Sequence, residues 1–401
     1  MLALEEARDR ILGALRPVPA ETVSLAEAWG RVLARPVRAR LHQPPADVSA
    51  MDGYALRASD ATVGARLRVV GAAPAGHPFQ GSVAAGEAVR IFTGGVVPQG
   101  LDAILIQEDA EAGDGWVAAR EAPQAGRYIR RRGLDFAEGE EVLPAGRRLT
   151  ARDVGLAASA NHPWLTVHRR PRIGLLATGD EIALPGEAIP VGGIVSSNTH
   201  ALAALVRAAG GEPVALPVAP DDREAIAAAG RAARGCDLLV TTGGASVGDH
   251  DLVQSALGEE GFTLDFWKIA MRPGKPLIWG RLGEVPVLGL PGNPVSTLVC
   301  GVQFLAPAVS VLSGLPAAPP RLIRVRVGAP LGANDRRFDH LRATLSEDRD
   351  GRVVAHPFPV QDSAMLKTLA RADALILRPP FAPALPEGAE AEVIPLGDMG
   401  F

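Results

Sequence analysis

The chain has few cysteines and no excess of charge of either sign. Its 401 residues include only Cys236 and Cys300, which form neither a CxxC motif nor a cluster with histidine. Two such thiols make no disulfide framework and fit a reducing cytoplasm. Lys and Arg number 41 against 45 Asp and Glu, so no chain-wide positive potential argues for nucleic acid or an acidic membrane. We therefore expect a cytoplasmic protein, and the charge balance leaves a small, charged substrate open.

The sequence also lacks internal repeats, low-complexity tracts and a targeting segment. Its start, "MLALEEARDRILGALRPVP", places apolar residues at helical spacing among charges of both signs, without the basic start and apolar block of a signal peptide. Residues 296–315 carry no charge and are long enough to span a bilayer. Gln303, Pro307 and several hydroxyls in this segment instead favour a buried helix in a large α/β core.

What is present indicates several domains, because the chain is too long for one typical core. We predict a multidomain α/β protein with a central doubly wound, mainly parallel sheet. The predicted parts are a helical N-terminal region (1–48 with 148–170), an inserted small β-rich module (49–147), a central α/β domain (171–316) and a C-terminal small β domain (317–401). In the first region, "LEEARDRILGAL" and "SLAEAWGRVLA" are expected helices, and Thr150 is placed to cap a third.

The central domain places unusual turns where its strands end. "TGDE" (178–181), "TTGGASVGDHD" (241–251), "RPGKP" (272–276) and "LPGNP" (290–294) each follow a predicted strand. Ligands of open α/β sheets bind beyond the carboxyl ends of the strands. Four glycine-containing turns at one edge can direct backbone N–H groups at a phosphate, although a glycine at a strand end often serves turn geometry alone.

Charged residues accompany these turns. Glu181, Asp221 and Asp251 would lie near the same edge, where carboxylates repel a polyanion unless a divalent cation intervenes. Mg²⁺ typically uses one or two carboxylates together with phosphate oxygens, so a metal-bridged phosphate ester is one interpretation; solvated helix caps are the other. Lys275 suits a fixed positive charge facing an oxyanion or is an ordinary surface lysine. It is no Walker lysine, because Pro276 replaces the Ser/Thr.

Residues 244–248 (GASVG) also fit the pattern around a hydrolase nucleophile, which would be Ser246. The available acids and histidines (Asp335, Asp339, His340, His356) lie beyond a proline-rich segment in another predicted domain, and no HGGG-type oxyanion loop precedes the serine. The next helix also begins several residues after it. We therefore interpret Ser246 as a hydroxyl donor.

Three motifs lie outside the central domain. "PPADVSAMDGYAL" (44–56) carries Asp52, and "RIFTGGVVPQGLDAILIQED" (90–109) carries Thr93 before paired glycines. "RYIRRRGLD" (127–135) clusters four arginines: Arg127, Arg130, Arg131 and Arg132. Such a cluster is commonly a solvated face, but beside a cleft it would attract anions.

Taken together and in this order, these motifs with "PAGRRLT", "LLATGDEI", "SSN", "GLPGNPVS" and "SAMLKTLARADALI" resemble the molybdopterin molybdenumtransferase family, whose relatives include the C-terminal region of gephyrin. The resemblance covers nearly the whole chain. It implies an elongated four-domain subunit, a homodimer, and an active cleft between the central α/β domain and the C-terminal β domain. The implied reaction takes adenylylated molybdopterin and molybdate, is assisted by Mg²⁺, releases AMP and leaves molybdenum on the pterin dithiolene.

The resemblance also implies roles for individual residues. Asp52, Thr93, Glu181, Asp221 and Asp251 would be catalytic, with Asp221 and Asp251 linked to the metal. The substrate-binding residues would be Arg272, Lys275, Ser296, Arg342 and Ser363 around molybdate, Gly243, Gly244 and Ser246 at a phosphate, and Asn198, Pro276, Pro291 and Asn293. Asp362 departs from the family's usual small residue before Ser363.

Other implied partners are the upstream adenylyltransferase and apo-molybdoenzymes or their chaperones, in transient contact. Two other functions stay open at this stage. The chain could transfer a nucleotide like that adenylyltransferase, which has a related α/β domain, or act as a non-catalytic pterin-binding scaffold. Arg and Lys suit a dianion such as molybdate, but the residues do not select molybdate over tungstate.

Overall fold

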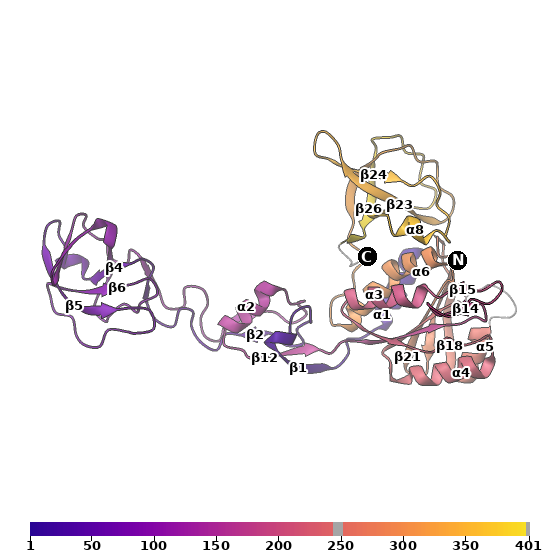
Figure 1. Ribbon diagram of the computed structural model, residues 1–401, viewed down its shortest axis with the longest axis horizontal. Helices are drawn as coiled ribbons and strands as arrows, with labels where there is room; N and C mark the ends of the chain where they lie inside the picture. Colours follow the sequence, from indigo (N-terminus) through magenta and orange to yellow (C-terminus); the bar gives the residue numbers. More distant parts are fainter. Residues whose placement is uncertain (244–251, 398–401) are drawn as a thin grey trace. The chain divides into compact units, whose positions relative to one another are not determined.

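The fold is given by a computed structural model that describes residues 1–243 and 252–397. The chain forms two compact units (Figure 1). Unit 1 contains Met1–Glu21, Gly30–Ala34 and the chain from Thr166 onward; unit 2 contains Thr22–Trp29 and Arg35–Leu165. The chain crosses between them four times, and two of the crossings lie in β1 (Ala20–Ser24) and β12 (Trp164–His168).

Unit 1 is built on a six-stranded mixed sheet. Its strands, in spatial order, are β16 (Glu212–Ala215), β13 (Arg172–Ala177), β17 (Leu238–Thr242), β21 (Val285–Leu290), β20 (Pro276–Leu282) and β18 (Phe262–Lys268). The first four are parallel, as the alternating sequence pattern predicted. The other two pairings are antiparallel, so the sheet is mixed, with three of its five pairings parallel. Two residues separate β20 from β21, and so short a connection can only form a hairpin.

Helices cover both faces of this sheet. One face packs on α1 (Leu4–Ala14), α3 (Asn198–Ala208) and a long helix made of α6 (Pro294–Cys300), a π-helical turn (Gly301–Leu305) and α7 (Ala306–Leu312). The other face packs on α4 (Arg223–Ala232), followed by the turn η4 (Ala233–Gly235), and on α5 (Leu252–Glu259). Two short strands, β14 (Ile182–Ala183) and β15 (Ile194–Val195), pair beside the sheet.

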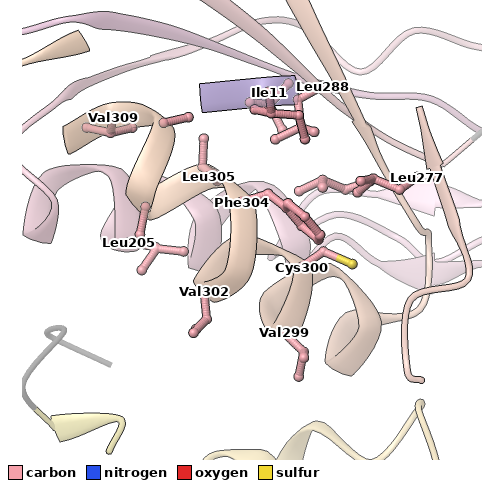
Figure 2. Packing of buried hydrophobic residues seen from close by; sticks show 14 of the residues in the cluster. Ile11, Leu205, Leu277, Leu288, Val299, Cys300, Val302, Phe304, Leu305 and Val309 are labelled. Carbon is pink, nitrogen blue, oxygen red and sulfur yellow. The ribbon is translucent and has the colours of Figure 1, made fainter. Parts of the chain in front are cut away.

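The long apolar helix is the centre of the main core. Figure 2 shows its side chains packed with Ile11 of α1, Leu205 of α3, Leu277 of β20 and Leu288 of β21. By length and composition, Pro294–Leu312 could cross a membrane, but 94% of that window is buried inside the protein. Pro307 has no N–H to donate to the preceding turn, and the helix widens into its π turn just before this residue. This burial confirms the buried core helix that the sequence favoured.

The C-terminal part of unit 1 is a small barrel-like β domain. Its sheet follows the order β19 (Met271–Arg272), β23 (Phe338–Glu347), β24 (Val353–Pro357), β22 (Ile323–Val327), β26 (Glu390–Pro395) and β25 (Ala374–Arg378). An additional β23–β25 pairing closes the last five strands on one another. The short helix α8 (Leu366–Leu369) lies between β24 and β25 in the chain. Strand β19 comes from the α/β region, so this pairing joins the two parts of unit 1.

Unit 2 contains a six-stranded sheet with its own core. The strand order is β7 (Ala103–Ile106), β4 (Gly53–Leu56), β6 (Glu87–Ile91), β5 (Arg66–Ala73), β9 (Trp116–Ala119) and β8 (Ala110–Gly113). Smaller pairs join β2 (Val37–Arg38) to β11 (Glu141–Leu143) and β3 (Val48–Ser49) to β10 (Ile129–Arg130). Short 3-10 turns are η1 (Leu25–Glu27), η2 (Ala58–Asp60) and η3 (Gln107–Asp109). Helix α2 (Ala151–Ser159) begins after Thr150, which forms a capping box with Asp153. The predicted cap is therefore confirmed.

The helical character predicted for residues 1–48 is wrong beyond α1. The expected second helix, at residues 24–34, is only the turn η1. Gly30 follows with a φ of 74°, a left-handed conformation that ends the helical hydrogen-bonding pattern. Leu33 then pairs with Val167 as a β-bridge. Helix α1 itself contributes to the core of unit 1 rather than to a separate helical region. A backbone partner that lies far along the chain outweighed the local helical spacing.

Candidate functional site

A cavity of about 670 Å³ lies where β13, β17 and β21 end. Its lining includes seven residues that the sequence predicted: Glu181, Asn198, Gly243, Pro276, Pro291, Asn293 and Ser296. These residues come from five separate segments of the chain, which the fold brings together at the carboxyl edge of the parallel strands.

At the cavity, the chain after β13 and the chain after β17 approach each other closely. Gly243 has a φ of 89°, and a Cβ placed there would lie 2.6 Å from the carbonyl oxygen of Thr178. The Thr178 N–H donates to the carbonyl of Thr242 (3.1 Å), which fixes the two chains side by side. Only glycine fits this position, because any other residue would be both strained and too close to backbone.

Two helices begin at the cavity. Helix α3 starts at Asn198 and the long helix starts at Pro294, and both residues line the cavity. The first N–H groups of a helix have no partner within it and carry partial positive charge, which favours an anion at that place. The serines Ser196, Ser197 and Ser296 add hydroxyl groups to the same lining. The cavity can therefore hold a phosphate with largely neutral donors.

Two polar atoms in the lining are buried without a hydrogen-bond partner among the described residues. The amide of Asn198 donates to the Gly292 carbonyl (2.7 Å), but its Oδ1 accepts nothing. The hydroxyl oxygen of Thr178 is also buried without a partner among the described residues. Buried polar groups are nearly always satisfied, so such atoms at a cavity are suited to a polar ligand. The apolar side chains of Ile182, Ile194 and Val195 line the same cavity.

The C-terminal β domain also reaches the cavity. The Asn293 amide donates to Ser363 Oγ (3.1 Å), the Val295 N–H donates to the Ser363 carbonyl (3.1 Å), and Ala364 is part of the lining. The unusual Asp362 accepts from the Ala364 N–H (2.8 Å) and so stabilises the turn beside Ser363. Its carboxylate therefore serves the geometry of this turn.

Arg342 is buried just behind this turn. Its guanidinium donates to Gln361 Oε1 (2.9 Å) and to the Asp362 carbonyl (2.6 Å). Burial lowers the pKa of Arg342, while the charge of Asp362 partly opposes that change. The residue lies near Ser363 in the fold, but it does not line the cavity.

Arg272, Lys275 and Asp221 also lie outside the cavity lining. Arg272 forms ion pairs with Asp335 (3.1 Å) and Asp339, and the bond to Asp339 raises its pKa. The side chain of Lys275 is exposed, and its carbonyl accepts from the Ile269 N–H. Asp221 is exposed, and its N–H donates to Asp180 Oδ1 (3.0 Å).

Three predicted residues, Gly244, Ser246 and Asp251, lie outside the described residues. Within the described part of the chain, no group of three or more His, Cys, Asp or Glu residues is placed to hold a metal. The metal pair Asp221 and Asp251 therefore stays a prediction.

The side chains that a Ser246 hydrolase would need are engaged with other groups. Asp335 and Asp339 bind Arg272. His340 is buried with its Nε2 2.8 Å from the Gln303 amide nitrogen, and His356 Nε2 lies 2.9 Å from Ser346 Oγ. None of these contacts pairs an acid with a histidine, so no acid–histidine pair of a triad is assembled by them.

In unit 2, Asp52 and Thr93 lie together. The N–H and the hydroxyl of Thr93 both donate to Asp52 Oδ1 (2.7 and 2.9 Å) and hold the pKa of that carboxyl below its usual value. The arginine cluster is partly paired: Arg131 binds Asp47 (2.6 Å), and the Arg127 guanidinium lies 4.8 Å from the centre of the Tyr128 ring.

Several lining residues were not singled out from the sequence. Thr178 and Ser197 stand inside the quoted motifs "TGDE" and "SSN", so their motifs carried the signal but the individual residues did not. Ile194 and Val195 had no signal, because apolar residues after a loop resemble any short strand.

Three family models match the chain in succession. They describe a MoeA N-terminal region (domain I and II) at residues 2–161, a probable molybdopterin binding domain at 174–310, and a MoeA C-terminal region (domain IV) at 324–396. A molybdopterin molybdenumtransferase of Haemophilus influenzae is 38% identical over 318 residues, which cover 78% of each chain. Molybdopterin molybdenumtransferase 2 of Mycobacterium tuberculosis is 37% identical over 395 residues, with 96% of each chain covered.

A crystal structure of the molybdopterin biosynthesis moeA protein from Pyrococcus horikoshii is similar to the whole fold. Its TM-score is 0.85 at 28% identity, and the match covers 98% of this chain and 99% of that one. Sequence similarity over most of the length, matched domain models in the same order and a shared fold all agree with the motif pattern. The chain belongs to the molybdopterin molybdenumtransferase family.

Proposed function

We propose that the chain inserts molybdate into adenylylated molybdopterin and releases AMP, as a molybdopterin molybdenumtransferase. The observation that carries this proposal is the cavity at the carboxyl ends of β13, β17 and β21, where two helices begin and serine hydroxyls gather. Such a site suits the phosphate groups of a nucleotide-linked substrate. The family membership supplies the reaction.

Residues of the cavity bind and orient the substrate in this proposal. Backbone N–H groups at the start of α3 bind phosphate oxygens, and Ser296 adds a hydroxyl donor. The buried Oδ1 of Asn198 accepts a hydrogen bond from the substrate. Because Gly243 has no side chain, it leaves space in the cavity for the substrate. Apolar residues of the lining exclude water around the less polar part of the ligand.

The carboxylates handle protons and the metal. Cleaving the pyrophosphate adds water across a P–O bond, and Glu181 in the cavity is placed to accept the proton of that water. Asp52, fixed by Thr93, is proposed as a further catalytic carboxylate. Carboxylates are the ligand type that Mg²⁺ prefers, so Asp221, which is exposed, would hold it together with Asp251. Bound there, Mg²⁺ would supply charge neutralisation for the phosphates.

We assign molybdate to the side of the cavity next to Ser363, with Arg342, Arg272 and Lys275 as cationic residues. Arg272 must share its guanidinium with Asp335 and Asp339, because both carboxylates hold it in the structure. We further propose a cytoplasmic homodimer that contacts an adenylyltransferase and apo-molybdoenzymes transiently. These parts follow from the family resemblance.

The test is AMP release from adenylylated molybdopterin by the purified protein with Mg²⁺, with and without molybdate. Asp251→Ala is compared with wild type, and Glu284→Ala, an exposed acid on the β20–β21 hairpin, is the matched control. Molybdate-dependent release that only Asp251→Ala loses supports the transferase and the metal carboxylate. ATP consumption without molybdate would favour nucleotide transfer, and no release under any condition would favour a binding scaffold.

A further inference from the structure

Arg90 lies beside the two turns that carry Asp52 and Thr93, which we call together the Asp52 turn. It stands on β6, opposite Tyr54 of β4 in the sheet of unit 2. Asp52 immediately precedes β4, and Thr93 follows β6 by two residues. Strand pairing therefore brings the two segments together, and Arg90 is the cation at their junction.

The guanidinium of Arg90 is held by four groups from three segments. Nη1 donates to the Gly53 carbonyl (3.0 Å), and Nη2 donates to Gln107 Oε1 (2.9 Å). The guanidinium carbon also lies 4.9 Å from the centre of the Tyr54 ring and 5.0 Å from that of Phe92. A planar cation with several donors can join neighbouring groups in this way, whereas an ammonium cannot reproduce the geometry.

Gly53 and Phe92 are direct neighbours of the catalytic pair in the chain, and Gln107 is hydrogen-bonded to it. Gly53 follows Asp52, and Phe92 precedes Thr93. The Gln107 N–H donates to the Asp52 carbonyl (3.1 Å), so Gln107 connects Arg90 to the backbone of Asp52 itself. No ion pair joins Arg90 to Asp52 in the part of the chain that the structure describes, although its charge adds to the lowering of the Asp52 pKa. Arg90 thus acts on Asp52 through the backbone and through its field.

We propose that Arg90 is a positioning residue that holds Asp52 and Thr93 in hydrogen-bonding register for turnover. The proposal rests on the proposed function, in which Asp52 is catalytic. Because Arg90 holds the turn through Gly53, Gln107 and two rings, replacing it loosens the Asp52–Thr93 hydrogen bonds while leaving the residues of the unit 1 cavity unchanged. It should therefore change kcat and not KM.

The first experiment measures the turn without the reaction. Amide hydrogen exchange of Thr93 is followed in wild type, Arg90→Gln and Arg90→Lys, with Arg68→Gln as the control. Arg68 lies on β5 of the same sheet, pairs with Glu87 and is largely exposed. Exchange of the Thr93 amide should rise about 10-fold or more in Arg90→Gln, less in Arg90→Lys, and remain at the wild-type rate in Arg68→Gln. Unchanged exchange in Arg90→Gln overturns the proposal, whatever the activity.

The second experiment measures molybdate-dependent AMP release. Arg90→Gln should lower kcat about 10-fold with KM within about twofold of wild type, and Arg90→Lys should recover part of the loss. In an Asp52→Asn background the same substitution should have little further effect, because both changes act on one group. Equal losses in the two backgrounds, or a loss confined to KM, contradict the proposal. A wild type without AMP release instead contradicts the proposed function, and the exchange result still decides the role of Arg90.

Discussion

The cavity of unit 1 and the Asp52 turn of unit 2 are built from different kinds of interaction. The cavity is formed by strand ends, helix starts, hydroxyls and amides, with Glu181 as its one charged lining residue among those the structure describes. The turn depends on charge: a carboxylate with two donors from Thr93, next to an arginine held by two rings. Strand pairing brings the segments of both regions together, but the first presents mainly neutral donors, whereas the second joins charged side chains.

This difference separates binding from chemistry. Neutral donors with fixed directions bind a phosphate group without large changes in charge, so the cavity is suited to affinity and orientation. A carboxylate kept ionised and fixed in place is suited to proton transfer or to charge stabilisation in the transition state. The comparison predicts that substitutions in the turn change kcat, and that substitutions in the cavity change substrate affinity or the folding of unit 1.

The largest effect is expected at Asp52. Asp52→Asn keeps the shape of the side chain but removes its charge, so it should lower kcat for AMP release by about 10²- to 10³-fold. The affinity for AMP should stay within about twofold of wild type, as measured by titration calorimetry. Asp114→Asn, on the exposed β8–β9 turn, is the control. If Asp52→Asn weakens AMP binding as much as it slows turnover, the separation of the two regions is wrong.

Acid should affect unit 1 at a higher pH than the Asp52 turn. Burial lowers the pKa of His340 to about 4, against about 6.5 in an unfolded chain. Between these values the unfolded chain binds a proton that the native protein does not, so stability is full above pH 6.5 and falls by up to ~3 kcal/mol as the pH approaches 4.

The carboxyls of Asp47 and Asp52 in unit 2 change stability in the same direction as His340, but at a lower pH. Hydrogen bonds lower their pKa values, so their contribution to stability is present above pH 3.8 and is lost only as the pH falls further. Urea unfolding from pH 7 to 4.5, followed by hydrogen exchange of peptides from each unit, measures the difference. His340→Gln removes the titrating group and should flatten the pH dependence of unit 1; an unaltered slope would count against this origin.

The floor of the cavity should not tolerate a side chain. Gly243→Ala adds both left-handed strain and a contact with the Thr178 carbonyl, and should cost about 2–4 kcal/mol of unfolding free energy. Gly283→Ala is the matched control, since that glycine also has a positive φ (58°) but nothing within 4 Å of the added Cβ. It should cost about 1 kcal/mol. Equal losses of Tm in the two variants would show that the contact with Thr178 contributes nothing.

The smallest of these effects is expected at Asn198. Asn198→Ala removes the hydrogen bond to the Gly292 carbonyl and the buried acceptor Oδ1. It should weaken AMP binding about 10-fold. The kcat of the saturated enzyme should change less than about threefold, in contrast to Asp52→Asn. Gln80→Ala, an exposed amide in unit 2, controls for the loss of a surface amide. A kcat loss with unchanged affinity would place Asn198 with the chemistry instead.

Much of unit 1 could be predicted from the sequence because its signals are local. Alternating apolar strands and amphipathic helices gave the order from β13 to the long helix, and glycine-containing turns after strands marked the cavity edge. The failure at residues 24–34 is equally informative. Their spacing is helical, but Leu33 pairs with Val167, and no local pattern reports a partner that far along the chain.

The sequence by itself determined the layers, the edge of the sheet that holds the cavity and the residue types at that edge. Only the tertiary structure decided which side chains face the cavity. Arg272 shows why: β19 pairs with β23 so that Arg272 lies opposite Asp339, and its guanidinium binds Asp339 and Asp335 instead of lining the cavity. The energy of a charged group depends on its nearest partners in space, and strand register, which brings distant residues together, selects those partners.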